Sequence, residues 1–506
     1  MTRIPDLGRI TSERQILRQH IQKRQNLGTS VKRLGPRRYP NRLGQDVLGL
    51  FRKPTARKAV IADMEMLEDF HAAGLKVPSF LEAGPRKQLY YDPNGVRAAI
   101  VTTGGLAPGL HRVIHSIVKR HHAYGRGPVF GVYNSFEGLQ NLADNQIALN
   151  PEMTEDWLYH GGSNLGNVRG GDKDEDTLKR VVARISENLA SNDINILYVV
   201  GGDGSLKVAH QVALANPERS IVGVPKTMDN DLLWVWQSFG FNTAVEQATR
   251  VINVLRGEAE STRRIGVIEL FGAEAGFVAA NAALASGHVD LVLIPEVFNL
   301  LGAEAAEQYL RDAVRYVEKV VRQRPHNPHA IKGKAHNPHA VIVVAEGVET
   351  VLRNKGAEIQ GVKVIKDSFC GAFRKWIEEL VREGHGKKME VFVNQPRHYI
   401  RALSANAHDQ IYCERLGAQA VDNALAGYTD FMISQWLAEF VLVPLRLVGF
   451  GKKSIPIQGM FWKQVVSSTG QPLSPAERTG EPEGEEGAES EAAATRASNS
   501  RRHAQH

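Results

Sequence analysis

From Val96 onward, short runs rich in β-branched residues alternate with longer segments that carry the apolar periodicity of helices. This alternation is typical of a parallel sheet whose strands are joined by crossover helices, so it predicts a doubly wound α/β fold. The predicted strands are 98–103, 129–133, 194–200, 220–224, 265–270, 290–295, 340–345 and 390–393, and the predicted helices are 110–122, 175–189, 244–259, 275–285, 303–322 and 369–383.

The chain has 506 residues, more than a single hydrophobic core usually serves, so two packed domains are expected. We place the first domain over 95–240 and the second over 241–466, behind an N-terminal extension of residues 1–94. Beyond Ser467 the residues are mostly Glu, Gly, Ala, Ser and Pro, which offer little apolar surface to bury. Residues 467–506 are therefore predicted to form a disordered tail.

The N-terminal extension is strongly basic, although the whole chain carries a net charge of only +7. Fifteen Lys and Arg residues precede Ile61, against three acidic residues. A nucleic-acid partner is not expected, because no aromatic–basic interleaving and no nucleic-acid-binding motif accompanies the charge. We interpret the extension as a solvated arm, or as an arm that packs on a neighbouring subunit.

The sequence predicts a cytoplasmic protein without a membrane segment. Its two cysteines, Cys370 and Cys413, form no close-spaced pair, which favours a reducing compartment. The start of the chain lacks the apolar core of a secretory signal. The longest apolar stretch, 431–450, is interrupted by Gln, Glu, Pro and Arg, so it is interpreted as buried core and not as a bilayer span.

The five residues HNPHA occur twice, at 326–330 and 336–340. Four histidines so close together raise the question of a metal site. Each pair brackets a proline, and no Cys or carboxylate cluster adjoins them, so surface histidines in a loop are the favoured interpretation.

Three loops that follow predicted strands are rich in glycine, and ligands of open α/β sheets bind at the carboxyl ends of strands. The first loop, 104–109, reads GGLAPG and precedes a helix, where backbone N–H groups can approach an anion. A tight turn that needs glycine explains this loop equally well. The second loop, 161–171, sets Arg169 among small residues, which suits bidentate binding of phosphate. An ordinary surface loop is the alternative.

The third loop gives the strongest signal. An acidic residue inside a phosphate-binding loop repels its ligand unless a cation lies between them, so Asp203 predicts Mg²⁺. The loop follows a buried strand, enters a helix at Leu206 and consists of Gly201, Gly202, Asp203, Gly204 and Ser205.

One strand later, the segment PKTMDND at 225–231 combines a base, a hydroxyl and a cation. Asp229 is the candidate general base for an attacking hydroxyl, and Thr227 and Lys226 are candidates to bond phosphate oxygens. An Asx turn is the structural alternative, and it is the weaker one beside three glycine-rich loops. The P-loop, protein-kinase and Rossmann signatures are absent from the sequence. The prediction is Mg²⁺-dependent phosphoryl transfer on another phosphate-binding architecture.

Over roughly 97–450 the sequence resembles the 6-phosphofructokinases. The motifs GGLAPGL, LGNVRGG, GGDGS, PKTMDND followed by SFGFNTA, VDLVLIPE and VVAEGV occur in the order of that family. The segment 398–431, which begins HYIRALSANAHDQ, is similar to the ATP-dependent plant and trypanosomatid subgroup. The resemblance implies two Rossmann-like domains and transfer of the γ-phosphoryl group of ATP to the 1-hydroxyl of fructose 6-phosphate.

The resemblance also implies roles for the residues at matching positions. Catalysis would fall to Asp229, Thr227, Lys226 and Arg169. The donor side would comprise Gly105, Arg169, Gly201, Gly202, Asp203, Gly204 and Ser205, with Asp203 on Mg²⁺. The acceptor side would comprise Thr227, Asp229, Asp231, Arg264, Phe271, Gly272, Glu346, Tyr399 and Arg401. In relatives an arginine at the position of Arg264 reaches across from a neighbouring subunit, so a homo-oligomer, a dimer or a tetramer, is implied.

Two positions bear on the phosphoryl donor. Relatives that use pyrophosphate usually carry aspartate at the position of Gly204, where its bulk and charge conflict with a nucleotide. Glycine there favours ATP. Lys226 is typical of the pyrophosphate enzymes but is also present in the plant-like ATP-using subgroup, so we give Gly204 more weight.

Two further positions depart from the family. Relatives have Met-Gly-Arg where this chain has Phe271, Gly272 and Ala273, and the missing arginine would help to neutralise the transferring phosphoryl group. The helix after the first glycine-rich loop carries His111 where relatives usually have asparagine. A kinase for another sugar, a pyrophosphate-dependent enzyme and a non-catalytic regulatory relative are therefore kept as alternatives.

Overall fold

Three buried strands form the centre of a nine-stranded sheet: β6 (Ala98–Thr102), β9 (Ile196–Gly201) and β10 (Ser220–Pro225). All their residues are buried, as expected for strands covered on both faces. This computed structural model describes residues 12–43, 51–60, 63–168, 174–324, 338–385, 389–436 and 438–478. The other strands of the sheet are β3 (Arg57–Ala59), β4 (Ser79–Glu82), β7 (Val129–Val132), β8 (Gln146–Leu149), β18 (Phe431–Trp436) and β19 (Glu439–Pro444).

The strand order in this sheet is β3-β4-β19-β18-β10-β9-β6-β7-β8. The five strands from β18 to β7 run parallel to one another. The pairings outside these five strands are antiparallel: β8 pairs with β7 on one side, and β19, β4 and β3 follow β18 in turn on the other. The sheet is therefore mixed, with a parallel centre.

Helices cover both faces of the large sheet. Alternate residues of β6 divide between two cores: Ala98 and Ile100 lie in one, and Ala99 and Val101 in the other. The first core includes buried residues of α3 (Leu110–Tyr124) and α15 (Ala407–Leu425). The second includes those of α6 (Glu175–Ser191) and α7 (Asp203–Ala215). The predicted doubly wound α/β arrangement is confirmed.

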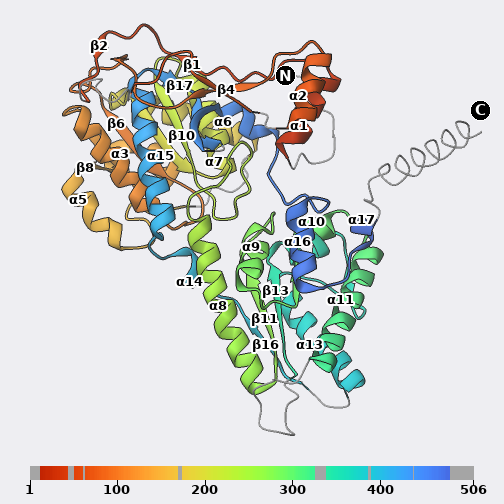
Figure 1. The fold of residues 1–506 in the computed structure, drawn as a ribbon. Helices are drawn as coiled ribbons and strands as arrows, with labels where there is room; N and C mark the ends of the chain where they lie inside the picture. Colours follow the sequence, from red (N-terminus) through yellow and green to blue (C-terminus); the bar gives the residue numbers. More distant parts are fainter. Residues whose placement is uncertain are drawn as a thin grey trace, which may run out of the picture.

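A second domain is built on a four-stranded, wholly parallel sheet of order β12-β13-β11-β16. Its strands are β11 (Ile265–Leu270), β12 (Leu291–Leu293), β13 (Ala340–Ala345) and β16 (Val391–Asn394). Its helices are α9 (Phe277–Ser286), α11 (Ala303–Gln323), α13 (Phe369–His385) and α16 (Met460–Thr469). The long helix α8 (Phe241–Thr262) runs from the junction of the two domains along the side of the second sheet (Figure 1).

The remaining described elements are shorter. They are α1 (Glu13–Gln22), β1 (Lys32–Arg33), β2 (Tyr39–Pro40), α2 (Met64–Ala72), β5 (Gln88–Leu89), α4 (Ser135–Leu139), η2 (Leu142–Asp144), α5 (Pro151–Glu155), η3 (Asp156–Tyr159), α10 (Pro295–Asn299), α12 (Gly347–Asn354), β14 (Glu358–Ile359), β15 (Val362–Lys363), α14 (Arg397–Arg401), β17 (Tyr428–Thr429), η4 (Leu445–Phe450) and α17 (Pro475–Arg478).

The predicted strands and helices are all present, with ends shifted by a few residues. The apolar stretch 431–450 is buried core, as expected, and forms β18, β19 and η4. These strands belong to the first sheet, although they follow the second domain in the chain: β18 pairs with β10. The first domain is therefore assembled from two separate stretches of sequence, where one continuous stretch, 95–240, was expected.

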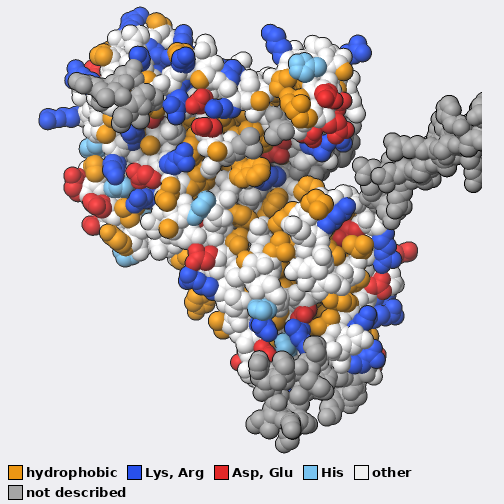
Figure 2. Space-filling view, viewed as in Figure 1, with side chains coloured by type: hydrophobic (Ala, Val, Ile, Leu, Met, Phe, Trp, Pro, Cys, Tyr) orange, Lys and Arg blue, Asp and Glu red, His pale blue; other side chains and the backbone are white. Residues whose placement is uncertain are grey.

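The N-terminal extension differs from the expected solvated arm, because its described part packs on its own domain. Ile16 and Leu17 of α1 are buried, and the carboxylate of Glu13 accepts a hydrogen bond of 2.7 Å from the backbone N–H of Trp234. Strands β3 and β4 extend the large sheet. On the face shown in Figure 2, basic side chains of the upper domain are interspersed with acidic and hydrophobic ones, so no continuous basic surface forms there.

The C-terminal segment was predicted to be a tail from residue 467, but the chain remains folded up to Arg478. Helix α16 continues to Thr469, and the buried side chain of Gln471 bonds both the N–H and the carbonyl of Val292, at 2.8 and 3.0 Å. The indole of Trp462 donates a hydrogen bond to Glu477. Residues 479–506 lie outside the described part of the chain.

Among the described residues, no helix combines the length and apolar character that a membrane crossing requires. Cys370 and Cys413 are buried and unpaired. Most of the histidine-rich repeat, 325–337, lies outside the described residues.

Candidate active site

A cavity of about 430 Å³ opens where β6, β9 and β10 end. Its wall comes first from the loops that directly follow these three strands, and apolar residues of α4, α6 and α7 extend it. Arg401 and Lys452, from segments that cross between the domains, complete it. The lining residues are Thr103, Gly104, Gly105, Leu106, Phe136, Leu178, Val181, Gly202, Asp203, Gly204, Ser205, Lys207, Val208, Lys226, Thr227, Met228, Asp229, Asp231, Arg401 and Lys452.

The loop after β9 needs glycine at its first position. A Cβ atom on Gly201 would lie 2.4 Å from Cβ of Ser205 and 2.7 Å from Cγ2 of Thr103, closer than atoms pack. Helix α7 then begins at Asp203, with Gly202 as its N-cap. A Cβ on Gly204 would meet nothing within 4 Å. The loop thus presents the N-terminal end of a helix to the cavity, and such an end attracts anions.

The two carboxylate oxygens of Asp203 differ in their partners among the described residues. Its Oδ2 accepts from Nζ of Lys207 at 2.9 Å. Its Oδ1 is buried and has no hydrogen-bond partner among the described residues. A buried carboxylate oxygen without a partner is costly unless a ligand or a cation completes it.

Three of the predicted loops converge on Gly105. Its carbonyl accepts hydrogen bonds from Nζ of Lys226 and, at 3.2 Å, from Nδ2 of Asn167. The neighbouring N–H of Gly104 bonds the carbonyl of Val168 at 3.2 Å. The loop 104–109, the described part of the loop 161–171 and the segment 225–231 therefore meet at Gly104 and Gly105. Arg169 follows Val168 but lies outside the described residues.

Asp229 is buried in the cavity wall, and its pKa is raised to about 7. Burial is the main cause, and the negative charges of Asp231 and Glu346 add to it. The charge of Arg401 and a hydrogen bond from the backbone N–H of Ala273 oppose the shift. Its Oδ1 has no hydrogen-bond partner within the described part of the chain. A carboxyl group that titrates near neutral pH and has an open oxygen suits a general base.

Two short hydrogen bonds fix the rest of the PKTMDND segment. The Thr227 hydroxyl donates to Oδ1 of Asp231 at 2.6 Å and accepts from the backbone N–H of Asp229 at 3.2 Å. The bond from the N–H of Asp229 to the Thr227 hydroxyl forms an ST turn, where an Asx turn was the structural alternative. Asp229 and Asp231 of this turn line the cavity.

Residues 271–273 contact the site through the ring of Phe271 and through their backbone. The guanidinium of Arg401 lies 4.2 Å from the centre of the Phe271 ring, a cation–π contact. Gly272 has a φ of +141°, and a Cβ there would lie 2.6 Å from the carbonyl oxygen of Ala275. Ala273 contributes its backbone N–H to Asp229. Phe271 is therefore a platform for Arg401.

Of the predicted acceptor residues, four line the cavity, namely Thr227, Asp229, Asp231 and Arg401, and five do not, namely Arg264, Phe271, Gly272, Glu346 and Tyr399. The side chain of Tyr399 is 83% exposed and does not line the cavity. Arg264 pairs with Glu390 at 2.8 Å and stands just before β11. It is thus at the amino end of that strand, whereas Phe271 follows its carboxyl end, about 20 Å along a strand of this length.

Sequence reasoning missed Lys452 and the apolar wall of the cavity. Nζ of Lys452 lies 3.0 Å from Glu274 and 3.6 Å from Asp231. The apolar wall consists of Leu106, Phe136, Leu178, Val181 and Val208. These residues come from four separate segments, because Leu178 and Val181 both lie on α6, so no local pattern marks them as one surface.

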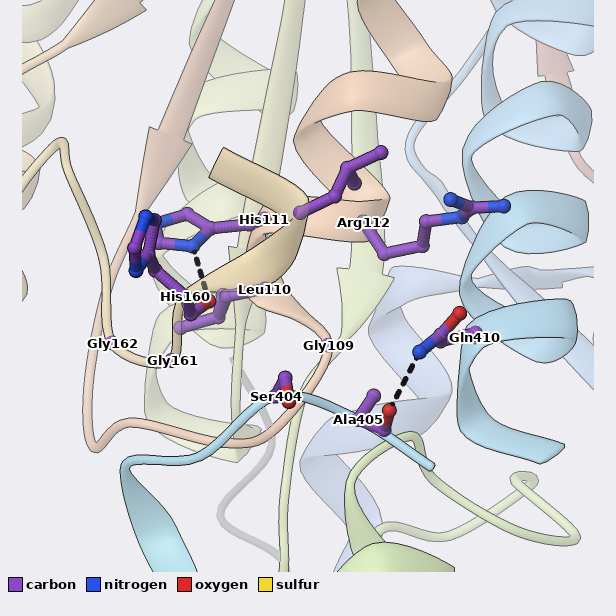
Figure 3. A pocket seen from close by; sticks show the side chains of 11 residues that line it. Gly109, Leu110, His111, Arg112, His160, Gly161, Gly162, Ser404, Ala405 and Gln410 are labelled. Atoms are coloured by element: carbon purple, nitrogen blue, oxygen red, sulfur yellow. Dashed lines mark hydrogen bonds between the residues drawn. The ribbon is translucent and has the colours of Figure 1, made fainter. Parts of the chain in front are cut away.

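His111 lines a separate pocket of about 20 Å³, room for roughly one water molecule. Figure 3 shows its imidazole next to His160: Nδ1 bonds the carbonyl of His160 at 2.9 Å. Its Nε2 accepts from the N–H of Asn164 at 3.0 Å, so Nδ1 carries the proton. Burial lowers the pKa of His111, which keeps it neutral. This histidine ties α3 to the loop before Arg169 and does not line the large cavity.

The sequence model of phosphofructokinase matches residues 97–424. An ATP-dependent 6-phosphofructokinase of Borreliella burgdorferi is 36% identical over 406 residues, which cover 78% of this chain and 85% of the relative. ATP-dependent 6-phosphofructokinase 7 of Arabidopsis thaliana is 33% identical over 417 residues, 79% of each chain.

Two solved structures have the same fold. Pichia pastoris phosphofructokinase in the T-state aligns with a TM-score of 0.56 and 21% identity over 70% of this chain and 35% of that one, so this chain spans about a third of it. The pyrophosphate-dependent phosphofructokinase of Marinobacter aquaeolei aligns with a TM-score of 0.56 and 19% identity over 74% of this chain and 91% of that one. By the extent of the family match and the identity to its curated relatives, this chain belongs to the phosphofructokinase family.

Proposed function

We propose that the chain is an ATP-dependent 6-phosphofructokinase, which converts ATP and fructose 6-phosphate into ADP and fructose 1,6-bisphosphate. The observation that carries the proposal is that Asp229, a buried carboxylate with a raised pKa, lines the same cavity as the glycine-rich loop at 202–205. The relatives that are named ATP-dependent 6-phosphofructokinase support the choice of donor and acceptor.

In this reaction the sugar O1 forms a bond to the γ-phosphorus while the bond from that phosphorus to the β–γ bridging oxygen breaks. Asp229 accepts the proton of the 1-hydroxyl, and ADP leaves. Lys226 holds the loop at Gly105 and adds positive charge to the cavity. Thr227 and Asp231 keep the base in position through their mutual hydrogen bond. We assign Arg169, which follows the loop ending at Val168, to the phosphates of the donor.

Mg²⁺ fits the residues at the donor loop. Magnesium usually binds one or two protein carboxylates and the substrate phosphates. The partnerless Oδ1 of Asp203 offers one such ligand. In the described part of the chain, no group of three or more His, Cys, Asp or Glu side chains could hold a metal by itself. When bound, the ion neutralises charge on the donor phosphates.

The apolar wall of the cavity favours a nucleotide over pyrophosphate. Pyrophosphate has no apolar part, whereas a purine ring gains from burial against side chains such as Phe136, Leu178 and Val181. The open space at Gly204 leaves room beside the donor loop. We therefore assign the apolar wall to the adenine base.

We also propose that the active enzyme is a homo-oligomer. Arg264 stands at the end of β11 remote from its own cavity and is 40% exposed, which suits a side chain that serves a neighbouring subunit. A cytoplasmic location stays a prediction, since one Arabidopsis thaliana relative, 35% identical over 397 residues, is named chloroplastic.

A coupled assay of the purified full chain, with fructose 6-phosphate, Mg²⁺ and either ATP or pyrophosphate, tests the proposal. Turnover with ATP is expected. Asp229→Asn should lower kcat by about 10²–10⁴-fold, the usual contribution of a general base. Asp193→Asn is the matched control, because Asp193 is exposed and its φ of +53° suits asparagine.

The possible failures of this test are distinct. A folded chain that turns over with neither donor contradicts the proposed function. Turnover with pyrophosphate alone contradicts the donor assignment, and an unchanged kcat in Asp229→Asn contradicts the assigned base.

A further inference from the structure

Lys452 lies where the two domains meet, in the segment that runs from η4 of the first domain to α16 of the second (Figure 1). Its side chain lines the large cavity and is 27% exposed. Its partners come from both domains: Asp231 follows β10, and Glu274 follows β11. The ammonium group therefore stands between the two loops that frame Asp229.

The backbone on the C-terminal side of Lys452 is firmly held. The N–H of Lys453 donates to the carbonyl of Asp231 at 2.8 Å, and its buried Nζ donates to the carbonyl of Val235 at 2.6 Å. The N–H of Ile455 donates to the buried carboxylate of Glu296 at 2.9 Å. With the main chain beside it held, Lys452 moves its ammonium group by rotating its four-carbon stem.

The surroundings of Asp229 carry more negative charge than one cation balances. Asp231 and Glu346 both raise its pKa, and Arg401 is the positive charge that opposes them. Arg401 is already stacked on Phe271, and Nζ of Lys226 bonds the Gly105 carbonyl. Ala273 provides only a backbone N–H and no charge. A polyanionic donor needs a further cation here, and Lys452 is placed to supply it.

We propose that Lys452 binds the transferring phosphoryl group and supplies a positive charge beside Asp229 in addition to Arg401 and Lys226. This inference rests on the proposed function. As the bond from sugar O1 to the γ-phosphorus forms and the bond to the bridging oxygen breaks, negative charge builds up on the phosphoryl and leaving oxygens. Before the donor binds, the ammonium group pairs with the Glu274 carboxylate. During the reaction it leaves this carboxylate and binds a phosphoryl oxygen.

The competing explanation is that Lys452 only links the two domains through its ion pairs. A matched pair of variants distinguishes this structural role from phosphoryl binding. Lys452→Met removes the cation and the ion pair, whereas Glu274→Gln removes the ion pair and keeps the cation. For a phosphoryl-binding lysine, Lys452→Met lowers kcat about 100-fold, the typical loss of one preorganised group. Glu274→Gln then keeps kcat within about threefold of wild type, as expected for a change that leaves the reacting atoms untouched.

The measurements are kcat and KM for both substrates and the melting temperature of each variant. Lys452→Arg restores the charge and should recover most of kcat even if Lys452→Met proves unstable. Equal losses of kcat in Lys452→Met and Glu274→Gln, with equal drops in melting temperature, would overturn the inference, as would an unchanged kcat in Lys452→Met. A wild-type chain without kinase activity would instead overturn the proposed function, and this inference with it.

Discussion

As the proposed base, Asp229 must be deprotonated before it can accept the proton of the sugar hydroxyl. Burial and the charges of Asp231 and Glu346 raise its pKa to about 7, so the carboxyl group stays protonated below neutral pH. We expect kcat/KM for fructose 6-phosphate to rise with pH through an apparent pKa near 7, because this parameter reports the free enzyme. The measurement is a pH profile of the coupled assay between pH 5.5 and 9, a range of about 1.5–2 units on each side of that pKa.

The control for this profile is Asp231→Asn. Removing the second-largest cause of the raised pKa should shift the rising limb to lower pH. Titration of the substrate phosphates does not depend on Asp231. A limb that stays in place in Asp231→Asn would show that Asp229 is not the titrating group.

The same raised pKa predicts a stability cost. The folded-state pKa of about 7 exceeds the ordinary value of 3.8, so the folded chain holds this proton more tightly than the unfolded chain. Stability is then lost as pH rises from about 4 to 7, and the full cost is present above pH 7. Asp229→Asn should therefore be more stable than wild type at pH 8, by roughly 2–4 kcal/mol, and the gain should shrink at pH 5.

Thermal unfolding of wild type and Asp229→Asn at the two pH values checks this expectation. An equal difference at pH 5 and pH 8 would mean that the carboxyl group is not held protonated by the fold. The stability of Asp193→Asn, at an exposed position, should not depend on pH in this way.

At the scale of elements, the junction of β9 and α7 needs glycine at position 201 for close packing, and it presents the N-terminus of α7 to the cavity. Gly201→Ala should destabilise the chain by about 1–3 kcal/mol, since its Cβ would contact Ser205 and Thr103. Gly204→Ala in the same loop has open space and lies within α7, where alanine is favoured over glycine by up to about 1 kcal/mol. Urea unfolding of both variants should give shifts of opposite sign.

Similar stabilities for these two glycine variants would contradict the packing of Gly201 under Ser205. The kcat/KM for ATP in Gly201→Ala adds a second readout, because a displaced loop moves the N-terminus of α7 away from the phosphates.

At the scale of the whole molecule, the described residues cross between the domains at the start of α8, between α14 and α15, and between η4 and α16. Figure 2 shows hydrophobic side chains across the narrow region where the domains meet. Because the last crossing returns the chain to the second domain, residues up to Arg478 help to close the core of that domain.

A chain that ends at Val466 should be less stable than one that ends at Arg478, by on the order of 2–5 kcal/mol. The shorter chain loses the bonds of Gln471 to Val292 and leaves the Trp462 indole without Glu477. Melting temperatures of the two truncated chains provide the comparison. Equal melting temperatures would mean that residues 467–478 add no stability, as predicted for a tail that begins at residue 467.

The local signals in the sequence determined the periodic elements and most of the phosphate-binding loops. Apolar periodicity and β-branched runs located the strands and helices of both sheets, because these patterns reflect which face of each element is buried. The glycines of the loop after β9 and the acidic residue beside them predicted a phosphate site, because small size and charge are properties of those residues themselves.

Only the tertiary structure decided which distant segments share a surface. Strand β18 joins β10 across two hundred residues, the N-terminal segment lengthens the same sheet, and Lys452 reaches Asp231 and Glu274 from the last crossing. Each of these contacts depends on the free energy of packing the whole chain, which no short stretch of sequence contains. For the same reason the sequence could name Asp229 as a base, whereas its pKa near 7 depends on burial and on charges that the fold brings together.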